Sequence, residues 1–265
     1  MTVTLTVLFV ADDGQTTLHV AVKNCQPDII RLLFSHGAAP DVRAFQDEIT
    51  PLMLAASMSN TLILNLLIAA GSNLDLQDGN GMCALHHCFN YYQDRVECVI
   101  HSVDCIKLLV MAGANIHIRD SLGRFPLTRA IEKLNMRGVR YLLAQNCDPE
   151  NQLLQSGLGQ YQSPLAYAFS VRNYRLANML WQAGASCQGL FSVHAPESVQ
   201  RKDFDLSAFV FSQPRTLKEV CRKTLRDKLR SSGRVGHKLL ESVEGLGIPA
   251  SLKDFVLMKD MLDMN

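Results

Sequence analysis

The sequence lacks the short motifs that mark the common catalytic and nucleotide-binding sites. None of its 265 residues form a G-x-S-x-G, a P-loop or an H-E-x-x-H pattern. Catalysis needs several reactive side chains held together, and without these motifs the sequence offers no candidate catalytic site. The sequence therefore favours a protein that binds other proteins over an enzyme, and it predicts no cofactor and no metal.

A strong charge of either sign is also missing. The chain has 26 Lys and Arg residues against 25 Asp and Glu, so its formal net charge of +1 gives little attraction to nucleic acid or to a membrane surface. Residues 215–238 are locally basic, with nine Lys and Arg against Glu219 and Asp227. No aromatic residue is interleaved there to stack on bases. We interpret this run as the solvated face of a helix, and nucleic-acid binding is the less favoured alternative.

The sequence has no C-x-x-C motif, and its eight cysteines are scattered along the chain. Such scatter is typical of free thiols in a reducing compartment, which indicates a cytoplasmic or nuclear protein. The apolar segment Met1–Val10 has neither a basic start nor a small-residue cleavage site, so no secretion signal is expected. Five histidines and cysteines lie close in sequence without matching a standard zinc site: His87, Cys88, Cys98, His101 and Cys105.

What the sequence does contain is an internal repeat. Segments such as Thr50-Pro51-Leu52-Met53-Leu54-Ala55 recur along the chain. Leucines hold the same place in these segments, at intervals of 34, 33, 42 and 38 residues: Leu18, Leu52, Leu85, Leu127 and Leu165. In each segment we expect Thr to cap a short helix, Pro to occupy the first turn and Leu to enter the core.

A second apolar segment follows each leucine and ends in a turn. The residues expected to end these second helices with positive φ are Gly37, Gly71, Gly113, Asn146 and Gly184. His19 and His86 are expected to tie a hairpin to a helix. Together these features resemble the ankyrin repeat, which has a period of about 33 residues and a T-P-L-H-x-A motif.

The resemblance implies an all-α fold, an ankyrin-repeat solenoid in which helix pairs alternate with β-hairpin fingers. We expect about five repeats over residues 1–187, the first of them truncated, with Met1–Val10 as part of an N-terminal cap. Residues 188–213 are expected to form a connector, and residues 214–265 a small helical region that packs at the end of the stack.

Two intervals are longer than the repeat requires. One excess lies within Asn90–Val103, between or within a helix pair, and it includes Tyr91 and Tyr92. The other lies around Glu150–Gln162 and predicts a longer hairpin loop. Insertions in repeat proteins often lie near a binding surface, although neutral drift on an exposed loop is an equal alternative.

A separate pattern lies near the C-terminus. Thr216 is expected to cap a helix, with Glu219 reaching back to complete a capping box. Leu217, Cys221 and Leu225 recur every fourth residue and therefore share one narrow face of that helix. A narrow apolar face with a small central residue allows a partner to approach closely.

This pattern, T/S-L-x-x-x-C-x-x-x-L, resembles the elongin-binding box of the SOCS-box family. The resemblance implies contacts with elongin C at Leu217, Val220, Cys221 and Leu225. The following tail is similar to the cullin box of the same family, although Gly247 stands where proline is usual. It implies cullin contacts at Leu246, Ile248, Pro249 and Leu252.

Ankyrin repeats followed by such a box resemble the ankyrin repeat and SOCS box family. That resemblance implies a non-catalytic substrate receptor of a ubiquitin ligase. Its box would recruit elongin C with elongin B, and cullin-5 with its RING protein, while the repeats hold the protein to be ubiquitinated. The alternative is an ankyrin scaffold or inhibitor whose C-terminal helices only cap the stack.

The target is expected to bind at the finger tips and the first insertion. The candidate residues are Phe45, Asp47, Glu48, Asp78, Arg124, Tyr91 and Tyr92. Phe45 is apolar in a predicted exposed tip, where it has no core to enter. The acidic residues among the candidates favour a basic target segment, unless these charges serve only to keep the fingers soluble.

Overall fold

The computed structural model of the chain describes residues 14–44, 47–89, 96–149, 154–155 and 161–185. It divides into two compact units, Met1–Arg129 and Ala130–Asn265, with the division inside α7. The elements are α1 (Thr17–Lys23), α2 (Pro27–Ser35), α3 (Pro51–Ser57), α4 (Thr61–Ala69), α5 (Ala84–His87), α6 (Val96–Met111), α7 (Pro126–Glu132), α8 (Met136–Ala144), β1 (Leu154–Gln155), β2 (Tyr161–Gln162), α9 (Pro164–Ser170) and α10 (Tyr174–Gln182).

The first helix of each repeat begins as the sequence predicts. The Thr50 hydroxyl accepts a hydrogen bond from the Met53 amide at 3.3 Å, and Pro51 occupies the first helical position of α3, where its missing amide costs nothing. The repeated leucines take the second position of α1, α3, α5, α7 and α9, and all five are buried: Leu18, Leu52, Leu85, Leu127 and Leu165. The repeat and its core positions are therefore confirmed.

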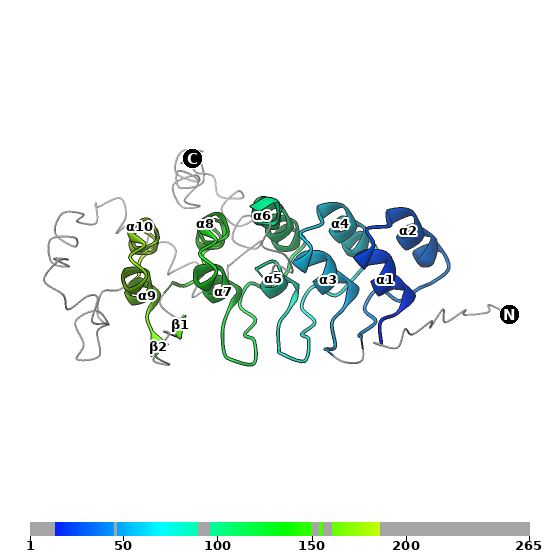
Figure 1. Cartoon of the computed structure of the whole chain (residues 1–265), viewed down its shortest axis with the longest axis horizontal. Coiled ribbons are helices and arrows are strands. Elements are labelled where there is room, and N and C mark those ends of the chain that lie inside the picture. The colour runs from blue at the N-terminus through cyan, green and yellow to red at the C-terminus, as the bar shows by residue number, and fades with distance from the viewer. Residues whose placement is uncertain (1–13, 45–46, 90–95, 150–153, 156–160, 186–265) are drawn as a thin grey trace, which may run out of the picture. The chain divides into compact units, whose positions relative to one another are not determined.

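In the first unit the helices form two rows. The first helices α1, α3 and α5 pack in order against one another, and the second helices α2, α4 and α6 do the same in the row above them in Figure 1. Each pair is joined by contacts between its own two helices, α1 with α2, α3 with α4 and α5 with α6. The core lies between the rows, where the apolar face of each second helix meets the small residues of the first.

The second helices end in left-handed turns, as predicted. The φ angles are +80° at Gly37, +84° at Gly71, +99° at Gly113 and +105° at Gly184, and +64° at Asn146. At Gly71 the Ser72 amide closes the turn on the Leu67 carbonyl at 3.1 Å. Glycine adopts this conformation without strain, and asparagine tolerates it better than other residues do.

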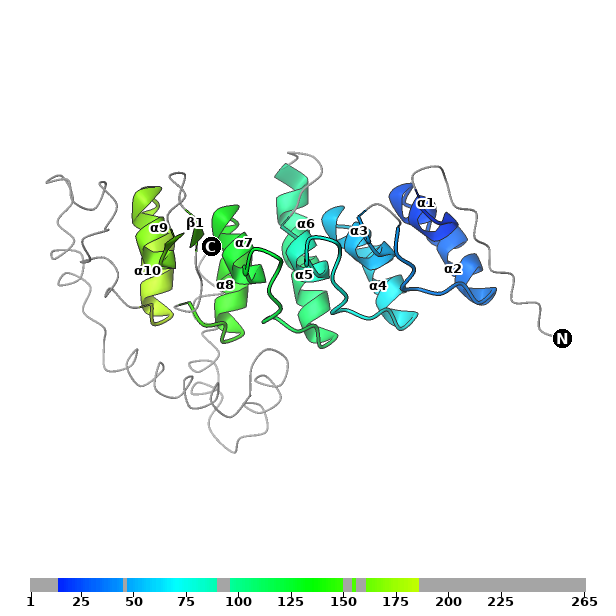
Figure 2. The ribbon, with the colours of Figure 1, turned by 90° about the horizontal axis from the view of Figure 1, so that it is seen from below.

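Part of the first insertion lengthens a helix. The second helices α2, α4, α8 and α10 each have 9 residues, whereas α6 has 16. The extra residues are at its N-terminal end, and α6 extends visibly past α4 in Figure 2. Residues 90–95, with Tyr91 and Tyr92, lie outside the described residues.

In the second unit, α9 packs against α10, and β1 pairs with β2 in an antiparallel ladder with Leu154 opposite Gln162. This ladder confirms a hairpin at the second insertion. Asn135 and Asn173 cap α8 and α10 by accepting hydrogen bonds from Gly138 and Leu176 amides at 2.9 and 3.0 Å.

Several predictions from the sequence lie outside the described residues. They include the N-terminal cap at Met1–Val10, the connector over residues 188–213 and the helices over residues 214–265. Those boundaries stay predictions. No helix in the described part of the chain is long and apolar enough to cross a membrane.

Candidate functional site: the finger tips of the repeats

The tips of the first unit are built on one plan. We name three fingers: the first finger (residues 44–49), the second finger (residues 78–82) and the third finger (residues 120–124). In each finger a backbone hydrogen bond joins the two end residues. The closing bonds run from the Ala44 amide to the Ile49 carbonyl at 3.0 Å, from Asp78 to Met82 at 3.0 Å and from Asp120 to Arg124 at 2.9 Å. The repeat therefore extends to the backbone of its loops.

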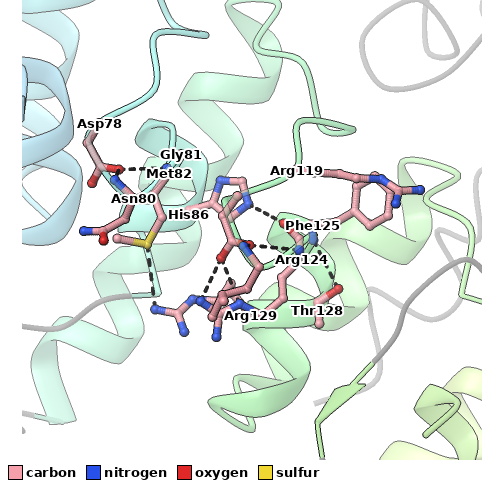
Figure 3. A network of polar contacts seen from close by, with 12 residues as sticks. Asp78, Asn80, Gly81, Met82, His86, Arg119, Arg124, Phe125, Thr128 and Arg129 are labelled. Atoms are coloured by element: carbon pink, nitrogen blue, oxygen red, sulfur yellow. Dashed lines mark hydrogen bonds and ion pairs between the residues drawn. The ribbon is translucent and has the colours of Figure 1, made fainter. Parts of the chain in front are cut away.

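The Asp78 side chain holds the second finger closed. One carboxylate oxygen accepts hydrogen bonds from the Asn80 amide at 2.9 Å and the Met82 amide at 2.8 Å, and the other oxygen lies 2.9 Å from His87 Nε2. Figure 3 shows Asp78, Asn80 and Met82. Asp78 is only 6% exposed. The prediction that it is an acidic contact for a target is wrong, because the carboxylate turns inward onto its own loop.

The charge of Asp78 is stabilised where it lies. Burial raises the pKa of this carboxyl group, but the hydrogen bonds from His87 and from the Met82 and Asn80 amides outweigh burial and leave the pKa below its ordinary value. The group is therefore a carboxylate at neutral pH, and it accepts hydrogen bonds from three donor groups: the Asn80 amide, the Met82 amide and the His87 ring.

Neighbouring fingers are joined to one another through their backbones. The Gly79 amide donates to the Asp47 carbonyl at 3.0 Å, and the Ser121 amide donates to the Asn80 carbonyl at 2.9 Å. The approach is close, since a Cβ at Gly81 would lie 2.6 Å from the Ser121 nitrogen. We call this series of tip-to-tip bonds the finger ladder. It fixes the spacing of the three tips and preorganises them for a partner.

The two repeat histidines tie each helix to the next finger, as predicted. His19 Nε2 lies 2.8 Å from the Ile49 carbonyl, and His86 Nε2 lies 3.0 Å from the Arg124 carbonyl. A carbonyl only accepts, so Nε2 carries the proton and Nδ1 of His86 accepts from the Cys83 amide at 3.3 Å. Burial lowers the pKa of His86 to about 4, which keeps the ring neutral.

Arg124 is paired within its own finger. Its Nε donates to Asp120 Oδ2 at 2.8 Å, and a terminal nitrogen lies 2.8 Å from the same oxygen. Asp120 also accepts the amides of Leu122 and Arg124, as Asp78 does in the finger before it. The guanidinium is half-buried (Figure 3). The main observed role of this predicted contact residue is therefore to join the two ends of its own finger through Asp120.

Sequence reasoning missed the apolar residue of the third finger. Leu122 is 64% exposed and occupies the register that Asn80 holds in the second finger. Beside it, the Arg119 guanidinium lies 4.5 Å from the centre of the Phe125 ring, a cation–π contact (Figure 3). Aligning the two Asp-x-x-Gly turns would have revealed Leu122, since both turns display their third residue.

The acidic residues of the first finger are exposed. Glu48 forms an ion pair with Arg43, so its charge is partly compensated. Asp47 forms no ion pair with any other described residue. Phe45, Tyr91 and Tyr92 lie outside the described residues. The described finger-tip surface therefore includes one unpaired carboxylate, one paired carboxylate, and the exposed Asn80 and Leu122 of the second and third fingers.

The cluster of histidines and cysteines near α5 has structural partners. His87 contacts Asp78, and the Cys88 and Cys105 side chains are buried. Burial raises the pKa of Cys105 to about 12 and that of Cys88 well above its ordinary value, so both are neutral thiols at neutral pH in this environment. Within the described ranges no three metal-binding side chains come together.

The predicted elongin and cullin contacts all lie outside the described residues. They are Leu217, Val220, Cys221, Leu225, Leu246, Ile248, Pro249 and Leu252.

Comparison with known proteins assigns the two regions. Residues 18–101 match the family model of ankyrin repeats, as the helix pairs and left-handed turns indicate. Residues 213–257 match the model of the SOCS box. The chain therefore contains ankyrin repeats and, further along, a SOCS box, and both regions of the resemblance noted from the sequence are confirmed.

Individual relatives are similar over parts of the chain. Ankyrin repeat and SOCS box protein 6 of Homo sapiens is 36% identical over 102 residues, which is 38% of this chain and 24% of that protein. The nuclear factor NF-kappa-B p105 subunit of Gallus gallus is 29% identical over 175 residues, 64% of this chain and 16% of the relative. Glycerophosphocholine phosphodiesterase gde1 of Schizosaccharomyces pombe is 37% identical over 72 residues, 27% of this chain and 6% of the relative. The chain thus spans less than a quarter of each of these proteins.

Proposed function

We propose that this protein is a non-catalytic substrate receptor of an elongin B/C–cullin-5–RING ubiquitin ligase. The observation that carries the proposal is the order of its two regions, ankyrin repeats at residues 18–101 followed by a SOCS box at residues 213–257. Ankyrin repeats bind proteins along an extended surface. A receptor of this kind raises the concentration of its target near a ubiquitin-conjugating enzyme and brings about its degradation without reacting itself.

In this proposal, Leu217, Val220, Cys221 and Leu225 bind elongin C. Leu246, Ile248, Pro249 and Leu252 face the cullin, with Gly247 in place of the usual proline. The target binds at the finger tips, where the finger ladder holds Leu122 and Asp47 at fixed spacing. Preorganised tips lose little conformational entropy on binding, which favours them as contact sites.

Co-purification with elongin B and elongin C tests the proposal. We expect the wild-type chain to form a stable ternary complex and Leu217→Ala/Cys221→Phe to lose it. Truncating a buried anchor commonly costs about 2 kcal/mol or more, which weakens binding about thirtyfold, and Phe replaces the small residue that allows a partner to approach this face closely. Lys223→Ala, on the opposite face of the same predicted helix, is the matched control and should retain the complex.

The alternative is an ankyrin scaffold whose C-terminal helices pack on its own repeats. In that case Cys221 faces inward, and neither the wild type nor the Lys223→Ala variant binds elongin C. Leu217→Ala/Cys221→Phe would then lower the free energy of unfolding of the chain instead of weakening a complex. Denaturant unfolding of the same variants separates the two functions.

A further inference from the structure

Basic side chains gather where the second helices of the second unit begin. Arg137 is the second residue of α8 and Arg175 the second residue of α10, and both are exposed. Lys133 and Arg172 are exposed in the turns that precede these helices, and Arg140 lies one turn further along α8, half-buried. We call these five residues the basic edge.

A contact between the two helix starts holds the basic edge together. Asn173, which caps α10, donates its side-chain amide to the sulfur of Met136, the first residue of α8, at 3.8 Å. Arg137 follows Met136 directly, and Arg175 follows the cap by two residues. Burial, and then the positive charges of Arg175 and Arg137, lower the pKa of Arg140, which places Arg140 within the electrostatic field of both other arginines.

This arrangement is unfavourable for the isolated protein. Arg137 and Arg175 lie in the first turn of their helices, where the helix dipole favours acidic residues, and neither first turn has one. The described part of the second unit holds five basic residues, all in the edge, against Glu132 and Asp148. Arg137, Arg172 and Arg175 form no ion pair with any described residue. Such a concentration of like charge is expected where an anionic partner binds.

Exposed apolar side chains lie among these charges. Leu134 is 43% exposed in the turn before α8, Tyr174 is 47% exposed at the start of α10, and Val171 is also exposed. Two of the three are aliphatic and cannot stack on nucleic-acid bases, which single-strand binding sites do through several aromatic residues. Basic and aliphatic side chains side by side suit an acidic peptide that also carries apolar residues.

We propose that the basic edge is a docking site for an acidic segment of a protein partner. Its carboxylates pair with Arg137, Arg175 and Arg172, and an apolar side chain of the segment packs against Leu134 and Tyr174. The site uses other residues than those of the finger tips and of the SOCS box, and the proposal does not depend on the ligase function proposed above.

Binding of a defined probe to the full-length chain tests this site. The probe is a short fluorescein-labelled peptide rich in Glu and Asp that carries one Leu and one Phe, followed by fluorescence anisotropy. We expect saturable binding that weakens as salt is raised to about 0.15 M and beyond. Arg137→Glu/Arg175→Glu should weaken it about tenfold or more, because like charges then face the peptide.

The matched control is Arg31→Glu/Lys107→Glu, which makes the same change in net charge at exposed positions of the first unit. It should bind the peptide like the wild type. A thermal melt adds a second readout. Replacing Arg137 and Arg175 by Glu relieves repulsion and suits the helix dipole, so the melting temperature should be unchanged or higher while peptide binding is lost.

Three results would overturn the proposal: no saturable binding of the acidic peptide to the wild type at low salt, equal loss of binding in the control and test variants, or tighter binding of a single-stranded RNA oligonucleotide than of the peptide. If Arg137→Glu/Arg175→Glu does not fold, Arg137→Gln/Arg175→Gln removes both charges with less perturbation and is judged by the same comparisons.

Discussion

Individual buried polar residues set the geometry of the finger tips. Asp78 and Asp120 each accept two amides of their own turn, and His86 joins α5 to the third finger. Every one of these side chains is nearly or fully inaccessible to solvent. A buried polar group that loses its partner is costly, so these residues determine a single loop conformation rather than merely adding stability.

The neutral state of His86 predicts an acid sensitivity. Its pKa is about 4 in the folded chain against 6.5 in the unfolded one, so only the unfolded state takes up a proton between these values. Stability is therefore full above pH 6.5 and is lost as the pH falls toward 4. By pH 5 the loss from this residue is about 2 kcal/mol.

Denaturant unfolding at neutral pH and at pH 5 measures this loss. His86→Gln cannot be protonated and can still donate to the Arg124 carbonyl, so its stability should fall less between the two conditions. His36→Gln, at an exposed position, should behave like the wild type. Equal losses in the wild type and His86→Gln would contradict the assignment of a neutral, buried ring.

At this scale the sequence predicted roles unevenly. The histidine ties could be inferred because the repeat fixes which residue follows the helix start. The acidic contact at Asp78 was wrong, because a pattern shows that an aspartate lies at a tip but not that its side chain returns to the loop amides. Leu122 was missed for a related reason: its exposure follows from the register that the second and third fingers share, and charge gives no sign of it.

Among the elements, the left-handed turns divide into two kinds. A Cβ added at Gly71 meets no heavy atom within 4 Å, whereas one added at Gly81 would lie 2.6 Å from the Ser121 nitrogen. Both glycines have positive φ, +84° and +71°. The first turn therefore needs glycine only for its backbone conformation, and the second also needs it for space.

Alanine substitutions should separate these two requirements. Gly71→Ala is expected to lower the free energy of unfolding by about 1–2 kcal/mol, the cost of left-handed backbone in an ordinary residue. Gly81→Ala should cost about 1–3 kcal/mol more, because the Ser121 backbone must move and the finger ladder with it. Urea unfolding of both variants measures the difference.

Gly71→Asn provides the control for this comparison, since asparagine already occupies the equivalent turn at Asn146. It should cost less than Gly71→Ala. Equal losses for Gly71→Ala and Gly81→Ala would show that the two tips are not packed as closely as described.

The elements themselves followed from the sequence because leucine spacing, capping residues and glycine turns all report on local geometry. The start of α6 did not. Extra residues between two helices can form a loop or lengthen a helix, and the apolar spacing of Val96, Val99 and Val103 is compatible with both. The spacing of one segment does not decide between these two outcomes.

On the scale of the whole molecule, the proposed binding functions should be separable. Leu217→Ala/Cys221→Phe is expected to lose elongin C and retain the acidic peptide, and Arg137→Glu/Arg175→Glu is expected to do the reverse. Co-purification and fluorescence anisotropy on both variants measure this. Loss of both activities in either variant would indicate a general folding defect or a shared surface.

The order of regions was predictable at this scale, and the basic edge was not. Repeats and the SOCS box are contiguous patterns that a linear reading detects. Arg137 and Arg175 are separated by a whole repeat, and the fold brings their helix starts close together, as the contact between Asn173 and Met136 shows. Their significance arises from the fold and is invisible in the local composition.

The finger ladder also constrains how such a chain can evolve. Each middle tip is bonded on both sides, as the second finger is through Gly79 and Asn80. Lengthening that finger by one residue would disturb two neighbours at once, so a tolerated insertion must arise elsewhere. In the first unit the added length has accumulated between α5 and α6 and in α6 itself. The ladder restricts the length of a tip that is bonded on both sides but leaves side-chain identity at that tip free to change, so new targets can be acquired by substitution alone.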